Sequence, residues 1–139
     1  MWAAELLETA RVGHLGLTDP AGRPRVLPVT FAVVDGCAWS AVDDKPKRRR
    51  GDELARVRWL RARPASALTV DRYDDDWARL AWVQLVGETM VLEAAGREHV
   101  LEALASRYRQ YRDRPPPGPL LCVRPSRVLC WRPGPDSPA

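Results

Sequence analysis

Three short β-type runs joined by tight-turn sequences occupy the first third of this chain, and they constrain its fold more than any other feature. Residues 12–18, 25–34 and 37–42 are rich in apolar and β-branched side chains, and segment 19–24 and the Asp35-Gly36 pair separate them. Asp-Gly between such runs is a strong signal for a two-residue β-hairpin turn. Connections this short join antiparallel neighbours, because a parallel pair needs a long crossover. The sequence therefore predicts an antiparallel sheet that begins near residue 12.

The rest of the chain adds three further β-segments and three helical segments. The expected strands are 12–18, 25–34, 37–42, 65–73, 79–92 with a bend at Gly87, and 120–131 interrupted by Pro125-Ser126. The expected helices are 3–11, 52–63 and 96–114. Pro28 cannot donate to a strand ladder, so it should lie at an edge, a bulge or a gap that faces a ligand. Six strands with inserted helices predict an α+β fold, in which a nearly closed antiparallel barrel has helices across its openings.

Size and composition fit one ordinary domain. The 139 residues, of which 45% are hydrophobic, are enough for a single core, and we expect one domain over 1–139 with a Pro-rich flexible tail at 132–139. No apolar run approaches 18 residues, so no membrane span is expected. The acidic, amphipathic start lacks the basic region of a secretion signal, and a cytoplasmic location is the default expectation.

The cysteines and histidines show no metal-ligand spacing. Cys37, Cys122 and Cys130 form no C-x-x-C pair, and buried free thiols are the preferred interpretation. His14 is interpreted as structural and His99 as a surface residue. Three adjacent aspartates at 74–76 lack the glycine of a calcium loop, which favours solvated carboxylates or contacts with arginines of a partner subunit.

The two lysines of the chain stand together in the segment Lys45-Pro46-Lys47-Arg48-Arg49-Arg50, directly after an apolar β-run. Five cations in six positions repel one another, so they require open water or an anionic guest. A solvated turn is the simplest interpretation, and a polyanion held at a strand end is the functional one. Nucleic-acid binding is disfavoured, because most aromatic residues fall in β-segments or on a buried helix stripe of Val100, Leu104, Tyr108 and Tyr111.

Several stretches together resemble a known family. They are Gly13-His14-Leu15-Gly16-Leu17-Thr18, Asp19-Pro20-Ala21-Gly22-Arg23-Pro24, Val26-Leu27-Pro28-Val29-Thr30-Phe31, Asp43-Asp44-Lys45-Pro46-Lys47-Arg48 and Asp71-Arg72-Tyr73-Asp74-Asp75-Asp76-Trp77. Their order is similar to that of the pyridoxamine 5′-phosphate oxidase-like proteins, and in particular of their deazaflavin-dependent branch. The resemblance spans nearly all of residues 3–132, and the last two stretches are its most specific part.

The resemblance implies a fold, an assembly and a cofactor site. The implied fold is a six-stranded antiparallel split β-barrel with flanking helices, the FMN-binding split barrel. The implied assembly is a homodimer that holds two cofactor molecules in grooves between its subunits. The resemblance also implies the residues that bind the cofactor. Lys45 and Lys47, with Arg48 or Arg49, would bind the phosphate, and Ser40, Ala41 and Val42 would line the ribityl chain. Pro28, Val29 and Thr30 would face the ring, and Trp77, from either subunit, would close over it.

Two points stay open at this stage. Relatives commonly continue the basic segment straight into a helix, whereas Arg50-Gly51-Asp52-Glu53-Leu54 stands here and adds two acids. Trp77 is equally suited to be an interface aromatic without cofactor contact, and Trp82 is expected in the core or an interface.

The expected function is that of an oxidoreductase that transfers hydride between a reduced deazaflavin (coenzyme F-420) and a small organic substrate. FMN in place of the deazaflavin is the alternative cofactor, and a non-catalytic flavin- or deazaflavin-binding protein is the alternative function. The residues single out no catalytic acid or base, because the cofactor itself carries such chemistry. The substrate is not readable from the chain.

Overall fold

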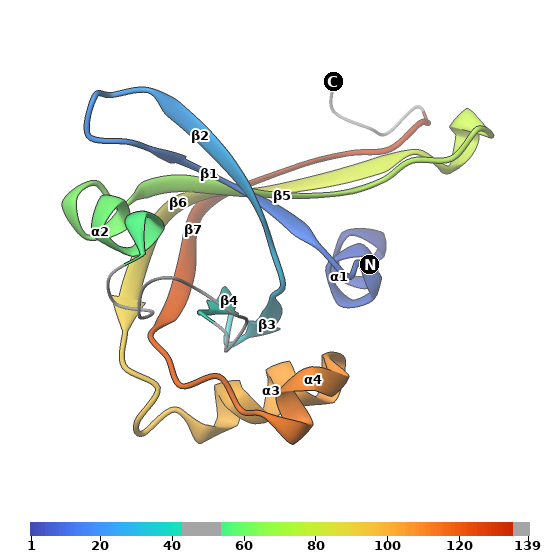
Figure 1. Ribbon diagram of the computed structural model, residues 1–139. Coiled ribbons are helices and arrows are strands. Elements are labelled where there is room, and N and C mark those ends of the chain that lie inside the picture. Colours follow the sequence, from blue (N-terminus) through green and yellow to red (C-terminus); the bar gives the residue numbers. More distant parts are fainter. Residues whose placement is uncertain (43–53, 135–139) are drawn as a thin grey trace.

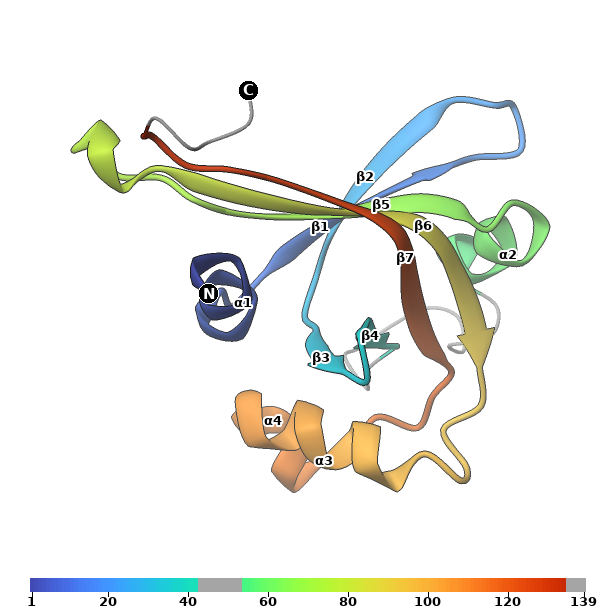
Figure 2. The same cartoon turned by 180° about the vertical axis from the view of Figure 1, so that it is seen from behind.

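The protein, described here from a computed structural model over residues 1–42 and 54–134, is built on one antiparallel sheet. The strands are β1 (Gly13–Thr18), β2 (Pro24–Val29), β3 (Ala32–Val34), β4 (Cys37–Ala41), β5 (Ala65–Arg72), β6 (Ala81–Leu92) and β7 (Leu120–Trp131). The helices are α1 (Trp2–Thr9), α2 (Ala55–Ala62), the 3-10 turn η2 (Trp77–Arg79), α3 (Glu98–Arg107) and α4 (Arg109–Asp113). Figures 1 and 2 show the sheet coiling strongly around its own inner face, with the helices placed around it.

The sheet confirms the expected α+β class and antiparallel pairing, but the expected count of six strands is wrong. In the described residues, seven strands follow one another in the order β2-β1-β5-β6-β7-β4-β3, and each pair of neighbours is antiparallel. The sheet is not closed, because its edge strands β2 and β3 do not pair with each other. These two edges are nevertheless consecutive in the chain. The single predicted strand 25–34 thus runs from one edge of the sheet to the other.

A tyrosine on the helical side explains why that strand divides at Thr30 and Phe31. The Tyr108 hydroxyl accepts a hydrogen bond from the Phe31 backbone N–H at 3.0 Å and lies 3.1 Å from the Phe31 backbone oxygen. The Phe31 N–H is therefore satisfied without a neighbouring strand. Its side chain is fully buried, which fixes the crossing point in the core.

Two turn predictions are confirmed. β3 and β4 form the hairpin expected at Asp35-Gly36, with Val34 opposite Cys37. Both turn residues have positive φ, 53° and 76°, as a type I′ turn requires. The expected bend at Gly87 is a register shift between β6 and β7, and a Cβ added there would come within 2.1 Å of the Arg124 backbone oxygen.

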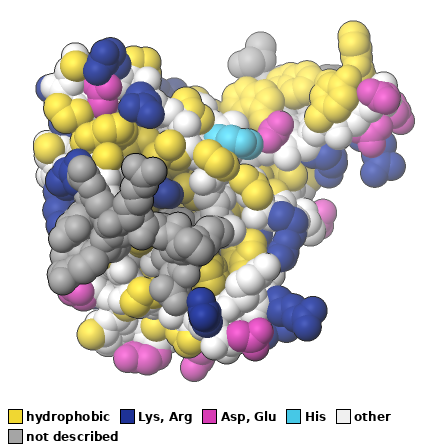
Figure 3. Space-filling view, viewed as in Figure 1, with side chains coloured by type: hydrophobic (Ala, Val, Ile, Leu, Met, Phe, Trp, Pro, Cys, Tyr) yellow, Lys and Arg dark blue, Asp and Glu magenta, His cyan; other side chains and the backbone are white. Residues whose placement is uncertain are grey.

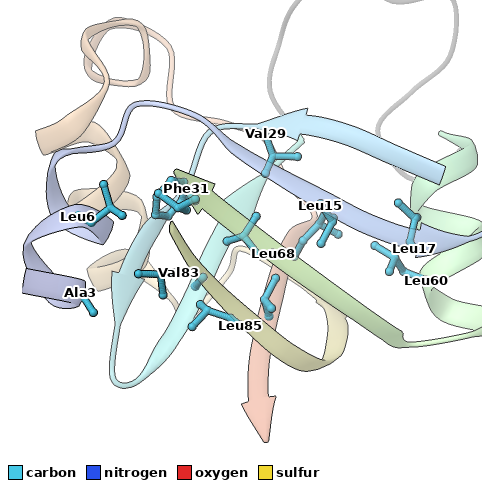
Figure 4. Close-up of a cluster of buried hydrophobic side chains, with 14 of the residues drawn as sticks. Ala3, Leu6, Leu15, Leu17, Val29, Phe31, Leu60, Leu68, Val83 and Leu85 are labelled. Atoms are coloured by element: carbon cyan, nitrogen blue, oxygen red, sulfur yellow. The ribbon is translucent and has the colours of Figure 1, made fainter. Parts of the chain in front are cut away.

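The inner face of the sheet forms the main core (Figure 4). Leu15, Leu68 and Val83, from neighbouring strands, are each no more than 1% exposed, and Phe31 meets them from the crossing segment. Helices α1 and α2 close this core through residues such as Leu6 and Leu60.

A second apolar cluster lies between the β3–β4 hairpin and helices α3 and α4. The predicted helical stripe of Val100, Leu104, Tyr108 and Tyr111 is buried there, as expected. The predicted single helix over 96–114 is divided, however, because Tyr108 leaves helical geometry at φ −124° and ψ 113°. The break turns the Tyr108 hydroxyl towards Phe31.

Arg107 ties helix α1 to helix α3. Its guanidinium donates hydrogen bonds to the backbone oxygens of Leu7 and Glu8, at 3.3 and 2.5 Å, and to that of Ala10. These carbonyls lie at the C-terminal end of α1, where a cation also suits the helix dipole. The same guanidinium lies 4.9 Å from the centroid of the Phe31 ring.

Asp19 organises the turn between β1 and β2. Its carboxylate accepts hydrogen bonds from the backbone N–H groups of Arg23 and Ala21, at 2.9 and 3.0 Å, and pairs with the Arg23 side chain at 3.1 Å. The backbone N–H of Arg23 is the largest cause that holds the pKa of this carboxyl below its usual value, against the opposing effect of burial.

No helix in the described part of the chain is long and apolar enough to cross a bilayer.

Candidate functional site

A groove on the outer face of the sheet is a candidate binding site. It has a volume of about 460 Å³ and is lined by His14 of β1, Thr69 and Asp71 of β5, and Trp82 and Gln84 of β6. Strand alternation puts these side chains outward, since their neighbours Leu15, Leu68 and Val83 point into the core. The strands that build the core therefore also build the groove.

Cross-strand register makes the groove floor a continuous row. Pro28 pairs with His14, His14 with Thr69, and Thr69 with Gln84. The Gln84 side-chain N–H donates a hydrogen bond to the Thr69 hydroxyl at 2.9 Å, which holds the amide in place along the floor. A fixed amide and hydroxyl beside an aromatic wall suit a flat ligand with polar edges.

Two ionisable groups stand at the rim of this row. His14 and Asp71 are both exposed, and Asp71 lies two residues beyond the Thr69 that pairs with His14. They are therefore diagonal neighbours on adjacent strands, close enough for long side chains to interact. Trp82 pairs with Asp71 on one side and with Trp131 of β7 on the other, and it forms the apolar end of the groove.

The three residues predicted to face a ring separate in the structure. Pro28 is exposed on edge strand β2 and borders the groove through its pairing with His14, as its missing N–H led us to expect. Val29 points into the core and is 6% exposed. The Thr30 hydroxyl shares a 2.8 Å hydrogen bond with the Tyr111 hydroxyl. Of the three, only Pro28 lies beside a residue that lines the groove, namely His14.

The predicted ribityl-lining residues are buried. Ser40, Ala41 and Val42 are 4%, 9% and 3% exposed. Ser40 and Ala41 pair with Leu121 and Leu120 of β7, and the Val42 N–H donates to the Pro119 backbone oxygen at 3.2 Å. They bring β4 to the start of the basic segment. The predicted phosphate ligands Lys45, Lys47, Arg48 and Arg49 lie outside the described residues.

Trp77 stands apart from the other candidate residues. It lies in η2 at the tip of an arm formed by the ends of β5 and β6, which projects away from the body of the molecule in Figures 1 and 2. Its side chain is 71% exposed, as is that of Tyr73 on the same arm. Within one chain the structure therefore does not bring Trp77 to β4 or to the groove.

The aspartates of the arm have local structural roles. Asp76 accepts a hydrogen bond from the Ala78 backbone N–H at 3.1 Å and caps η2. Asp74 accepts one from the Asp76 N–H at 2.8 Å and pairs with Arg79 at 3.0 Å. These contacts fix the tip that presents Trp77.

Apolar side chains remain exposed on the outer side of the molecule. Figure 3 shows hydrophobic side chains gathered along the projecting arm, beside a histidine and acidic groups. Val26 of β2 is 65% exposed, and Trp82 and Trp131 of the outer face are only partly buried. A run of exposed apolar surface next to a polar groove is typical of an interaction face.

Sequence reasoning missed most of the groove. His14 was interpreted as structural, and Thr69, Asp71 and Gln84 were not singled out. The sequence does indicate that these residues face outward, because they occupy the polar positions of strands in which polar and apolar residues alternate. The sequence does not show, however, that β1 lies next to β5 and β5 next to β6, which is what brings these four residues together.

A second, smaller pocket of about 360 Å³ lies between α1, β3 and α3. It is bounded by Leu7, Ala32 and Arg107 among others. The guanidinium of Arg107 is already engaged by the backbone oxygens of α1, so this pocket belongs to the packing of the helices.

Comparison with known proteins identifies the fold. No family model matches the chain, and no curated protein matches it in sequence. A conserved hypothetical protein of Mycobacterium tuberculosis matches in structure with a TM-score of 0.75 at 20% identity, over 95% of this chain and 85% of that one. A putative pyridoxamine 5′-phosphate oxidase of Listeria innocua matches with a TM-score of 0.67 at 18% identity, over 91% and 93% of the two chains. The fold, an antiparallel sheet with flanking helices, is similar to that of the pyridoxamine 5′-phosphate oxidase-like split barrels.

A third structure with this fold is described as an FAD-binding protein. It comes from Mesorhizobium loti and matches with a TM-score of 0.66 at 19% identity, over 93% of this chain and 91% of that one. At these identities the likeness establishes the split-barrel fold alone.

Proposed function

We propose that this protein is an oxidoreductase that binds a phosphate-bearing ring cofactor, the deazaflavin coenzyme F-420, between two copies of the chain. The reduced cofactor would pass hydride to a small organic substrate. The observation that carries the proposal is the outer-face groove beside Pro28, in a fold shared with an FAD-binding protein and a putative pyridoxamine 5′-phosphate oxidase.

The residues of the groove fit such a ring. Its volume of about 460 Å³ lies within the usual range for ligand sites. The indole of Trp82 offers an aromatic surface at one end, and the Gln84 amide and Thr69 hydroxyl offer hydrogen bonds along the floor. Pro28, on the neighbouring strand, adds an edge without a backbone donor.

The phosphate tail would be held by Lys45 and Lys47, with Arg48 or Arg49 assisting. Strand β4 ends at Ala41 and helix α2 begins at Ala55, so the basic segment is tied to the sheet at one end and to a helix at the other. Each charge-assisted hydrogen bond to a phosphate contributes about 1.5–3 kcal/mol, so two or three of them would anchor a cofactor.

A second copy of the chain is part of the proposal. Trp77 is 71% exposed at the tip of its arm, and the outer face carries exposed apolar side chains such as Val26. Docking of one copy against the outer face of another would cover both features and would let Trp77 close over the partner's ring. A homodimer with the cofactor at its interface is thus the assembly we propose.

The tasks of the chain in this reaction are binding, orientation and exclusion of water. When bound, the cofactor supplies the hydride chemistry. Trp82 and the Gln84–Thr69 pair would orient the ring, and the arm of a second copy would keep water from its open face. His14 and Asp71 are the ionisable residues that line the groove, and we assign neither of them a proton transfer.

Two alternatives remain within the proposal. FMN shares the phosphate-bearing ribityl tail and would use the same cations. A non-catalytic carrier of the same ring would need the groove but no substrate space. Fluorescence titration of the purified protein with deazaflavin, with FMN and with riboflavin, which lacks the phosphate, separates the first pair and measures the part played by the phosphate.

Lys47→Ala tests the cation assignment in the same titration. Loss of one charge-assisted hydrogen bond should weaken cofactor affinity about 10- to 150-fold, whereas riboflavin affinity should not change. Arg109→Ala, which removes an exposed cation on α4, is the matched control and should bind as wild type. Equal affinity of Lys47→Ala and wild type would refute the assignment, and absence of binding to either cofactor would refute the proposal.

Turnover distinguishes an enzyme from a carrier. The protein loaded with reduced cofactor should oxidise it faster in the presence of at least one member of a panel of quinones, enones and tetrapyrroles. Tight binding without hydride transfer to any member would favour the carrier.

A further inference from the structure

Two of the three cysteines face each other across neighbouring strands. Cys122 of β7 pairs with Trp39 of β4, and Cys37 lies two residues before Trp39 and hence on the same face of the sheet. Both thiols belong to the second apolar cluster, beneath α3. The register makes them diagonal neighbours on adjacent strands. The third cysteine, Cys130, packs against the main core instead.

The two thiols differ in their access to solvent. Cys122 is 1% exposed, and burial, followed by the charge and the hydrogen bond of Cys37, raises the pKa of its thiol to about 12. Cys37 is partly exposed at the first residue of β4. An oxidant in solution therefore reaches Cys37 first, while Cys122 stays a protonated thiol at the diagonal position on the neighbouring strand.

We propose that Cys37 and Cys122 form a reversible disulfide under oxidation by a peroxide. The Cys37 thiolate attacks one peroxide oxygen, which gives a sulfenic acid at Cys37 and releases hydroxide. The Cys122 sulfur then displaces the sulfenic hydroxyl, which leaves with the thiol proton as water, and the S–S bond closes. One peroxide is reduced to the equivalent of two waters, and the two thiols lose two electrons.

The start of β4 can make the small movement that this bond requires. Diagonal neighbours on adjacent strands lie about 7–8 Å apart at Cα, slightly more than the usual limit of about 7 Å for a disulfide. Cys37 lies outside the β4–β7 ladder, whose described register begins at Ala38 and Val123. Its other neighbour, β3, is a three-residue edge strand. Moving Cys37 therefore breaks no pairing with β7.

The bond would fasten the β3–β4 hairpin to the long strand β7. The same strand β4 continues through Ser40 and Ala41 to the basic segment, so oxidation would stiffen the support of that segment. The disulfide itself does not depend on the proposed cofactor.

Intact-mass analysis and alkylation test the pair directly. The reduced, full-length protein is treated with stoichiometric hydrogen peroxide, quenched with catalase and alkylated with a maleimide. Wild type should lose about 2 Da, as one disulfide requires, and should leave Cys130 as its one alkylated cysteine after unfolding. Peptide mapping should find Cys37 linked to Cys122, and a thiol reductant should restore both thiols.

Single substitutions supply the controls. Cys130→Ser should form the disulfide as wild type does, whereas Cys37→Ser should retain two alkylatable thiols and no intrachain link. Cys122→Ser should accumulate sulfenic or sulfinic acid at Cys37; if it fails to fold, Cys37→Ser carries the comparison alone. Overoxidation of Cys37 in wild type, a link through Cys130, or crosslinked chains in place of an intrachain bond would each overturn the proposal.

Discussion

The two faces of this sheet are made by the same strands, yet they are covered in opposite ways. On the inner face Leu15, Leu68 and Val83 are each no more than 1% exposed and pack against Phe31. One residue further along the same strands, His14, Thr69 and Gln84 line an open groove with Trp82 at its end. The inner face is complete within one chain. The outer face leaves both polar groups and apolar surface exposed. This exposure is what we expect of a face that binds a ligand or a second copy of the chain.

Truncation of Phe31 should show the largest difference between the faces. Phe31→Ala removes a fully buried ring at the strand crossing and should lower the free energy of unfolding by about 3–5 kcal/mol. Trp82→Ala, on the partly exposed outer face, should cost about 1 kcal/mol or less in the monomer. Urea denaturation monitored by circular dichroism measures both. Similar losses of unfolding free energy in the two variants would show that the two faces do not differ in their contribution to stability.

Loss of the arm aromatic should act on assembly and leave the fold intact. Trp77→Ala removes a side chain that is 71% exposed, so monomer stability should stay within about 0.5 kcal/mol. If Trp77 anchors a partner copy, dimer affinity should fall at least about 30-fold, as for a hot-spot aromatic. Sedimentation velocity over a dilution series measures this, with the exposed α3 substitution Glu102→Ala as control. A wild-type protein that is monomeric at every concentration would contradict the dimer.

The Tyr108 hydroxyl should contribute measurably to the free energy of unfolding. It accepts from the Phe31 N–H and can donate to the Arg11 backbone oxygen at 2.9 Å. Tyr108→Phe leaves the buried Phe31 backbone unsatisfied and should lower the free energy of unfolding by about 1–3 kcal/mol. Tyr73→Phe, on the exposed arm, should have no measurable effect in the same urea experiment. Wild-type stability of Tyr108→Phe would show that the hydroxyl does not divide β2 from β3.

Substitution of Asp19 should have the smallest effect on the free energy of unfolding, and this effect should depend on pH. Its folded-state pKa lies below the ordinary value of 3.8, chiefly because of the Arg23 backbone N–H, so the ionised carboxylate stabilises the fold at neutral pH. That contribution is complete above the ordinary value and is lost as pH falls through the lowered pKa. Asp19→Asn should therefore be less stable than wild type at pH 7, and the difference should shrink towards pH 3. A difference that does not change with pH would assign the effect to packing.

Much of the inner face could be predicted from the sequence. Alternation predicted the strands, Asp35-Gly36 predicted the β3–β4 turn, and Pro28 predicted an edge. The division of strand 25–34 could not be predicted, because it depends on a tyrosine 77 positions away that binds the Phe31 backbone. Local patterns carry no information about that contact.

The outer face was harder to predict for a related reason. Predicting a groove requires the order of strands in the sheet. β1 and β5 are neighbours in the sheet, although the β3–β4 hairpin and helix α2 lie between them in the sequence. The resemblance predicted Pro28 at the ring and Trp77 closing over the ring, and the structure places the first beside the groove and the second on an exposed arm. The cations of the basic segment, where the resemblance is most specific, lie outside the described residues and stay a prediction.

The two histidines of the chain offer the most direct test of the outer-face site. His14 lines the groove, whereas His99 lies on α3 beside Asp35, 3.7 Å from its carboxylate. Imidazole resonances of 15N-labelled protein are followed by NMR as coenzyme F-420, and separately FMN, is added. We expect a bound cofactor to shift the His14 resonances and to leave those of His99 unchanged. Binding that leaves the His14 resonances unchanged would place the ring outside the groove and refute the proposed site.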